Sequence, residues 1–174
     1  MPVPYDAGGG NYRPAHFHLL ISGPGYQSLV TQVYFTGDPY LANDASSSSP
    51  TAKARILPVE NGTSGKKTVT FNVIMRDKLL VEPAAIDKLV GTYVFEEEEN
   101  QITFFNNSGQ LWMRNEVFGK GFDYLGNNTF EYPGGTSDHS FTLTFELLNN
   151  GFVQLKTTTI QNGKKRLKTA RKEI

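Results

Sequence analysis

The sequence predicts an all-β protein made of two parts, and three observations lead to this prediction. Short runs rich in Val, Ile, Thr and aromatic residues recur along most of the chain, separated by clusters of Gly, Asn, Ser and Pro. In the second part these runs are spaced by roughly 8–12 residues, which is typical of an antiparallel β-meander. One stretch with helical composition, residues 83–90, marks the change from the first part to the second. We therefore expect domains at residues 1–82 and 83–174.

Four strands are expected in the first part. Their apolar and β-branched residues are concentrated at residues 17–22, 28–35, 53–59 and 66–75. Residues 43–50 contain four consecutive serines, a composition that indicates a loop. Residues 60–65 combine Asn, Ser and two glycines, so they predict a hairpin-like turn between the third and fourth strands.

The second part is expected to open with a short helix and to continue as an up-and-down meander. Pro83 suits the first position of a helix, because an N–H there has no partner within the helix. Asn-Asn, Asn-Gly and Gly-Gly pairs mark tight turns between the later runs. Seven strands are expected, at residues 92–96, 101–105, 110–115, 129–132, 140–147, 152–160 and 164–171.

Composition excludes several classes of protein. The 174 residues include no cysteine, which rules out disulfides, thiolate metal sites and cysteine nucleophiles. The chain has 17 Lys and Arg against 17 Asp and Glu, so it lacks the positive field that nucleic-acid binding needs. No apolar run approaches the roughly 20 residues that cross a bilayer. The first residues lack the pattern of a signal peptide, and the compartment is left open.

A basic cluster lies near the C-terminus. Its Lys and Arg residues, between positions 164 and 172, are interspersed with Leu167, Thr169 and Ala170. This pattern predicts a last strand with a charged, solvated outer face rather than a surface that binds nucleic acid.

The segment that carries chemistry is residues 12–18, Tyr-Arg-Pro-Ala-His-Phe-His. Because residues i and i+2 of a strand point to the same face, His16 and His18 are expected side by side, with Phe17 on the opposite face. Two imidazoles placed in this way can share one metal ion, since imidazole is a ligand for Zn, Cu, Fe and Ni. Taken alone, however, such a pair is more often an ordinary polar strand face.

The residues around the histidines resemble a known family. The motif R-P-A-H-x-H at residues 13–18, followed by T-Q-x-Y-F-x-G-D at 31–38, closely resembles the intradiol ring-cleavage dioxygenases, which include catechol 1,2-dioxygenases and protocatechuate 3,4-dioxygenases. The similarity covers roughly residues 1–80. It implies that residues 1–82 form part of an antiparallel β-sandwich, without the N-terminal part of the family's domain, and that the substrate is a catechol-type aromatic cleaved by O₂.

The resemblance also implies a mononuclear non-haem Fe(III), which the family holds with two tyrosinates and two histidines. His16 and His18 fall on the two histidine positions. Tyr5 is the favoured match for the second tyrosine, which serves in turn as ligand and base, and Tyr12 is the competing candidate. Arg13 matches the arginine that stabilises negative charge on the substrate, and Gln32 matches the active-site glutamine.

Two departures from the family's pattern set further expectations. The family's first tyrosine lies upstream of the residues present here, so we expect the chain as given to be weakly active or inactive as a ring-cleavage enzyme. The alternative is a non-catalytic binding protein that retains the dioxygenase scaffold. The apolar face of the first part must also be covered, either by the second part or by self-association of the chain. The residues of this face are Phe17, Leu19, Ile21, Val33 and Phe35.

The second part has no recognisable catalytic constellation. Its opening at residues 90–93 and its run of hairpins are loosely similar to the β-meander modules appended to bacterial serine hydrolases and peptidases. Six aromatic residues are candidates either for the lining of a ligand cup or, as is more common, for the hydrophobic core. They are Trp112, Phe104, Phe118, Phe122, Tyr124 and Phe130.

Overall fold

The computed structural model describes residues 1–97, 100–114, 121–149 and 151–173. Its regular structure is mostly β, which confirms the predicted class. The chain divides into two compact units. The first contains residues 1–21 and 29–75, and the second contains residues 22–28 and 76–174. The predicted strand tips at residues 22 and 28 therefore group with the second unit.

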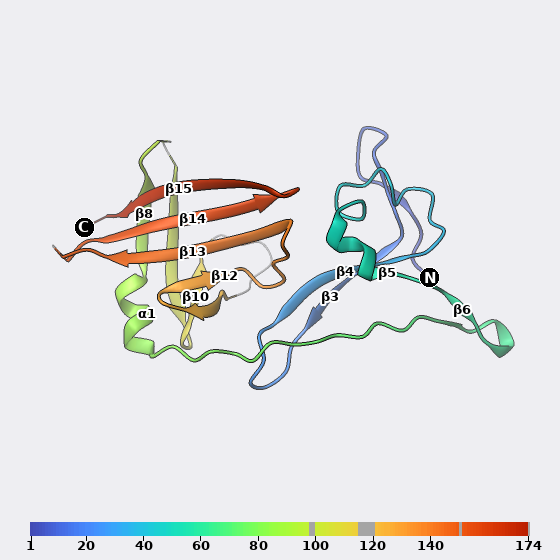
Figure 1. The fold of residues 1–174 in the computed structure, drawn as a ribbon, viewed down its shortest axis with the longest axis horizontal. Helices are drawn as coiled ribbons and strands as arrows, with labels where there is room; N and C mark the ends of the chain where they lie inside the picture. The colour runs from blue at the N-terminus through green and yellow to red at the C-terminus, as the bar shows by residue number, and fades with distance from the viewer. Residues whose placement is uncertain (98–99, 115–120, 150, 174) are drawn as a thin grey trace. The chain divides into compact units, whose positions relative to one another are not determined.

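The first unit is built from three small sheets (Figure 1). Its strands are β1 (Tyr5–Asp6), β2 (Tyr12–Arg13), β3 (His16–Ile21), β4 (Leu29–Phe35), β5 (Ile56–Leu57), β6 (Glu60–Asn61) and β7 (Lys67–Thr68). β3 and β4, both predicted as strands, form a long antiparallel pair, and β5 adds to β4 in parallel. β1 pairs with β2 and β6 with β7, both antiparallel, so the predicted hairpin-like turn at 60–65 is confirmed.

Two predicted strands of this unit are largely wrong. Residues 53–59 were expected to be extended, but a 3₁₀ helix, η1 (Pro50–Arg55), occupies the first half. Its Ala, Lys and Arg residues favour helical backbone, and Pro50 suits the first helical position. Of residues 66–75, only Lys67 and Thr68 pair with another strand, because β6 offers two residues as partners. A short 3₁₀ turn, η2 (Thr63–Gly65), lies between these two strands.

The second unit contains an eight-stranded antiparallel barrel (Figure 1). Its strands are β8 (Gly91–Phe95), β9 (Gln101–Asn107), β10 (Gln110–Met113), β11 (Asp123–Gly126), β12 (Thr129–Glu131), β13 (His139–Leu147), β14 (Val153–Gln161) and β15 (Lys164–Lys172). From β8 to β10 and from β11 to β15, neighbours in the sequence are neighbours in the sheet, and β15 pairs with β8. A bridge between Leu111 and Phe122 closes the circle, with the Phe122 N–H donating to the Leu111 carbonyl at 2.8 Å. The predicted meander is therefore confirmed.

The prediction missed one barrel strand, β11. Its sequence, Asp-Tyr-Leu-Gly, is only four residues long and carries a glycine at its end. Glycine and aspartate are depleted in strands, so the local composition indicates a turn. Its pairing with β12 on one side, together with the closure beside Phe122, supplies the extended structure that its own residues do not favour.

The turn between β14 and β15 shows how the meander is encoded locally. Asn162 and Gly163 both have positive φ, at 52° and 73°. A two-residue type I′ turn requires this conformation, and Asn-Gly is the pair that adopts it most readily. The turn fixes the register in which Gln161 faces Lys164 across the hairpin.

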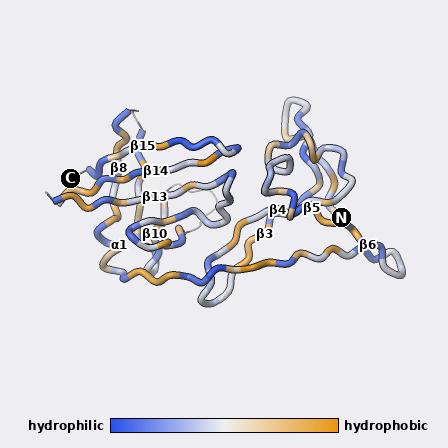
Figure 2. Tube along the Cα trace, viewed as in Figure 1, coloured by the Kyte–Doolittle hydropathy of each residue, from blue (hydrophilic) through white to orange (hydrophobic). Residues whose placement is uncertain are grey.

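β15 is paired unequally on its two sides. Residues 164–171 pair with β14, whereas β8 pairs only with residues 170–172. Among the described residues, no strand pairs with the other side of residues 164–168. Figure 2 shows the strongly hydrophilic character of β15, in agreement with the predicted charged last strand.

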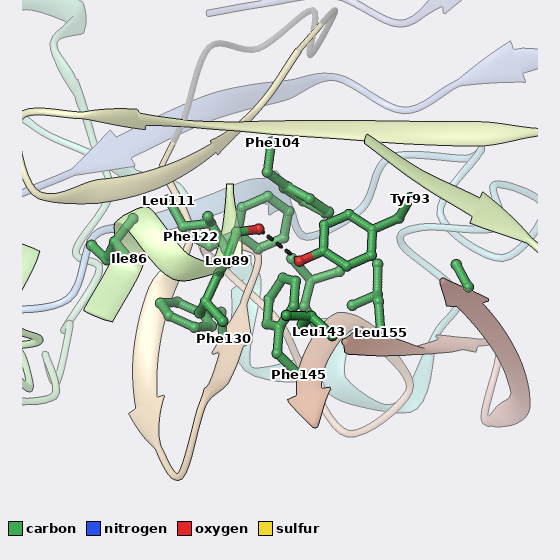
Figure 3. Close-up of a cluster of buried hydrophobic side chains, with 12 residues drawn as sticks. Ile86, Leu89, Tyr93, Phe104, Leu111, Phe122, Phe130, Leu143, Phe145 and Leu155 are labelled. Atoms are coloured by element: carbon green, nitrogen blue, oxygen red, sulfur yellow. Dashed lines mark hydrogen bonds between the residues drawn. The ribbon is translucent and has the colours of Figure 1, made fainter. Parts of the chain in front are cut away.

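The core of the second unit lies inside the barrel and is closed by helix α1 (Pro83–Leu89), which the sequence predicts (Figure 3). α1 packs against β9 and β10, and its Ile86 and Leu89 are fully enclosed. The Tyr93 hydroxyl is satisfied by donating to the Leu89 carbonyl at 2.8 Å. No described helix is long and apolar enough to cross a membrane.

The aromatic residues considered as a ligand cup are mostly core residues. Phe104, Phe122 and Phe130 are each no more than 2% exposed, and they meet their neighbours edge to face. Tyr124 packs partly buried against the same cluster. Phe118 lies outside the described residues. The interior at these positions is therefore filled by side chains.

The apolar face of β3 and β4 is only partly covered within the single chain. Val33 and Phe35 are buried, but Phe17 is 47% exposed although it meets Phe35 edge to face. Val33 and Phe35 of β4 are therefore withdrawn from water as expected, whereas Phe17 is not. Self-association of the chain through this face stays a prediction.

Candidate functional site

The β3–β4 ladder places four polar side chains on one face. His16 lies opposite Tyr34, and His18 lies opposite Gln32. Since the side-chain period of a strand is two residues, these four share one face, and Phe17 points to the other. A pair of short strands therefore brings two imidazoles, an amide and a phenol together.

The two imidazoles converge. Their Nε2 atoms are 3.1 Å apart, so the predicted placement on one face is confirmed. The Nδ1–H of His16 donates to the carbonyl of Pro14 at 2.7 Å, because a carbonyl can only accept. In neutral His16 the lone pair is therefore on Nε2, the atom that faces His18. Such a hydrogen bond on the far nitrogen is what orients metal-binding histidines in proteins.

Tyr5 and Tyr12 lie in different surroundings. Tyr5 is the cross-strand partner of Arg13 on β1 and β2, and its ring centre is 5.7 Å from that of His16. Tyr12 instead stacks on Tyr40, with ring centres 5.0 Å apart. Of the two candidate tyrosines, Tyr5 is the one whose ring meets a histidine of the pair.

Arg13 is held by two described side chains beside this group. Its Nε donates to Oδ1 of Asp44 at 2.8 Å, and one Nη donates to Oε1 of Gln32 at 3.0 Å. The Tyr34 hydroxyl donates to the same Gln32 oxygen at 2.7 Å. Asp44 is itself buried and accepts the backbone N–H of Ser47 at 2.9 Å.

The charges of the site follow from these contacts. Burial alone would raise the pKa of Asp44, but hydrogen bonds from Arg13 and Ser47 outweigh it and lower this pKa. Burial raises the pKa of Tyr34, which keeps the phenol protonated as a donor. Burial, followed by the charges of His16 and Arg13, lowers the pKa of His18 and favours the neutral imidazole. A neutral imidazole is the form that binds a metal ion.

Sequence reasoning missed Asp44 and Tyr34. Asp44 lies in the serine-rich segment that composition marks as a loop, where an acidic residue is ordinarily solvent-exposed. Tyr34 could have been found, because it follows Gln32 at the same i, i+2 spacing that identified the histidine pair. No local signal connects Asp44 to Arg13, since 31 residues separate them in the chain.

The described residues contain no group of three His, Cys, Asp or Glu side chains that could hold a metal ion. A metal centre beside His16 and His18 would therefore need a phenol oxygen or another group as its third protein ligand. Two described tyrosine rings lie near that of His16, with ring centres 5.7 Å away for Tyr5 and 5.8 Å away for Tyr34. The Tyr34 hydroxyl already donates to Gln32, so Tyr5 is the better candidate for such a ligand.

Comparison with known proteins identifies the class to which the first part of the chain is related. Residues 5–77 match the family model described as Dioxygenase. Over this range the chain is homologous to the C-terminal domain of the intradiol dioxygenases. The matched segment contains β1 to β7 and all the polar side chains of the site described above.

The similar proteins are named as 1,2-dioxygenases of catechols or hydroxyquinols. A chlorocatechol 1,2-dioxygenase of Rhodococcus opacus is 37% identical over 92 residues, covering 43% of this chain and 35% of that protein. A 6-chlorohydroxyquinol 1,2-dioxygenase of Cupriavidus pinatubonensis is 56% identical over 34 residues, covering 20% of this chain and 12% of that protein. A catechol 1,2-dioxygenase of Candida albicans is 40% identical over 53 residues, covering 25% and 18%.

The chain spans about a third or less of the length of these relatives. No solved structure matches it significantly. The family match ends at residue 77, before helix α1 and the barrel begin.

Proposed function

We propose that residues 5–77 bind a mononuclear non-haem Fe(III) through Tyr5, His16 and His18 and take part in the intradiol cleavage of a catechol-type aromatic by O₂. The observation that supports this proposal most is the convergence of the two Nε2 atoms, 3.1 Å apart, beside the ring of Tyr5. The homology of this segment to catechol and chlorocatechol 1,2-dioxygenases supports the substrate class.

The donor set fits a ferric ion. Two nitrogen ligands at about 2.1 Å from one ion and 90° apart would be about 3.0 Å from each other, close to the separation of the Nε2 atoms. The bond from His16 Nδ1 to Pro14 leaves Nε2 free to coordinate. Imidazole nitrogen and phenolate oxygen are both suitable ligands for iron, and a phenolate supplies anionic charge.

The chain's own residues divide the remaining tasks. A ferric ion held there would supply Lewis acidity that favours the deprotonated form of a catechol. Tyr5, in this proposal, would be a ligand whose phenolate accepts a substrate proton. Arg13 carries a fixed positive charge beside Tyr5, where it stabilises negative charge that develops on the ring. Gln32, opposite His18, orients a substrate oxygen by hydrogen bonding.

Iron loading of the full chain tests the metal site. We expect one Fe(III) per chain and a visible tyrosinate-to-iron charge-transfer band. His16→Ala and His18→Ala should each lose bound iron, and Tyr5→Phe should lose the band. Tyr12→Phe is the matched control, because Tyr12 is similarly exposed but stacks on Tyr40, and it should keep both iron and band. Retention of the band in Tyr5→Phe together with its loss in Tyr12→Phe would reverse the assignment.

Oxygen uptake tests the reaction. The iron-loaded chain is offered catechol, protocatechuate and hydroxyquinol, and the ring-opened product is identified by mass spectrometry. Uptake that requires His16 and His18 supports ring cleavage. Iron and catechol binding without any uptake would favour the alternative, a binding protein that retains the dioxygenase scaffold.

A further inference from the structure

The described hydrogen bonds of Arg13 use only some of its guanidinium N–H donors and leave others for a ligand. Asp44 accepts from Nε at 2.8 Å, and Gln32 accepts from one Nη at 3.0 Å. Tyr5 is the cross-strand partner of Arg13. Arginine has five N–H donors in a planar fork, so donors remain for an oxygen that approaches beside Tyr5.

The same contacts fix which way the Gln32 amide faces. Its Oε1 accepts from Arg13 and from the Tyr34 hydroxyl, at 3.0 and 2.7 Å. Two donors cannot be met by an NH₂ group, so the oxygen must face Arg13 and Tyr34. The NH₂ group of Gln32 takes no part in these two bonds, and its side chain lies on the face that it shares with His18, its cross-strand partner. The imidazole pair therefore lies next to a set of hydrogen-bond donors.

We propose that Asp44 is the positioning residue of this site: by holding Arg13 through Nε, it sets the direction of the guanidinium and of the Gln32 amide, and it makes this face a receptor for an oxyanion beside the two imidazoles. The inference deepens the proposed function, on which it rests for the identity of the oxyanion as a catecholate. Asp44 touches neither the imidazoles nor Tyr5 in any described contact, so its action is indirect.

The position of Asp44 suits this role better than a purely structural one. It is 9% exposed, and its two oxygens are divided between Arg13 and the backbone N–H of Ser47. The bond to Ser47 fixes the carboxylate within its loop. The bond to Arg13 connects this loop to the site. A charged and buried partner restricts an arginine far more than a neutral one, because charge-assisted hydrogen bonds are about twice as strong as neutral ones.

Asp44→Asn keeps the shape of the side chain and removes its charge. Ser49→Ala is the matched control, because it removes another buried hydroxyl of the same loop, 3.5 Å from Oγ1 of Thr51, that makes no described contact with Asp44. The first measurement uses the metal-free full chain, in which the Nε–H of Arg13 is followed by NMR. We expect slow solvent exchange of this proton in the wild type and in Ser49→Ala, and exchange at least tenfold faster in Asp44→Asn.

The second measurement uses the iron-loaded chain and 4-nitrocatechol as the probe. Asp44→Asn should bind iron within about twofold of the wild type but bind the probe about 10–100-fold more weakly, the range typical of a lost outer partner at a metal site. Unchanged exchange and unchanged probe affinity would overturn the inference, as would equal losses in Asp44→Asn and Ser49→Ala. A chain that binds no iron would refute the proposed function, and the NMR measurement would still decide the role of Asp44.

Discussion

Asp44 in the first unit and Asp123 in the second are both buried, and their pKa values shift in opposite directions. Asp44 in the first unit and Asp123 in the barrel are 9% and 6% exposed. The pKa of Asp44 is lowered, because Arg13 and Ser47 donate to the carboxylate and outweigh its burial. Burial raises the pKa of Asp123 to about 6, and the charge of its cross-strand partner Glu131 adds to this rise.

The difference teaches that burial alone does not decide what a charged side chain does. In the first unit a buried carboxylate is matched by a cation and can position other groups. In the barrel the carboxylate of Asp123 lies opposite another acid, and the charge of Lys78 and a backbone hydrogen bond from Ser28 offset its burial only in part. We therefore expect the first unit to depend on its charges and the barrel to depend on its apolar core.

Truncation of the barrel core should have the largest effect on stability. Phe104 is 2% exposed and meets Tyr93, Phe122 and Phe145 edge to face. Phe104→Ala should lower the free energy of unfolding of the barrel by about 3–5 kcal/mol. Denaturant unfolding followed by fluorescence of Trp112, the single tryptophan of the chain, measures this change. If Phe104→Ala lost iron binding while its first unit stayed folded, the expectation that each unit depends on its own interactions would be wrong.

Loss of the Asp44 charge should have the next largest effect, confined to the first unit. Asp44→Asn should lower its stability by about 1.5–3 kcal/mol, the range for hydrogen bonds to charged groups. Because the folded-state pKa is lowered, the contribution of Asp44 is complete above its ordinary pKa and is lost as the pH falls through the lowered value. Amide hydrogen exchange of β4 at pH 7 and at pH 2.5 tests this, and the difference between the wild type and the variant should be smaller at the lower pH.

Removal of the Asp123 charge should act in the opposite direction. Because the folded-state pKa is raised to about 6, the contribution of Asp123 is most favourable below its ordinary pKa and declines as the pH rises towards 6. Asp123→Asn should therefore stabilise the barrel at pH 7.5 by on the order of 1–3 kcal/mol and have little effect at pH 3.5. Thermal unfolding at the two pH values measures the difference. A destabilised variant at pH 7.5 would show that Asp123 is better paired than its pKa indicates.

The exposed Phe17 should matter least for stability and most for association. With 47% of its surface exposed, Phe17→Ser should change the free energy of unfolding by about 1 kcal/mol or less. If copies of the chain meet through the apolar face of β3 and β4, the variant should lower the mass observed by light scattering during size-exclusion chromatography. A wild-type particle of 19.3 kDa at every concentration would refute self-association.

The parts of the fold that could be predicted from sequence are those specified by neighbouring residues. Asn162-Gly163 sets its own turn, and the i, i+2 spacing sets the common face of His16 and His18. Residues 66–75 and β11 were wrong or missed, because pairing with distant strands decided their structure. The same limit applies to the site. His16, His18, Arg13 and Gln32 lie in two local motifs, whereas the contact from Asp44 to Arg13 depends on the path of a loop.

The unequal pairing of β15 has a consequence for aggregation. A strand with an open row of backbone donors and acceptors is a template on which another chain can add. Within the part of the chain that the structure describes, no strand pairs with residues 164–167 on the side away from β14. Lys164, Lys165 and Arg166 lie there, and a second β15 arriving at this edge would bring the same positive charges into contact. Repulsion between these charges therefore disfavours the addition of a second chain at this edge, and the repulsion should weaken as the ionic strength rises.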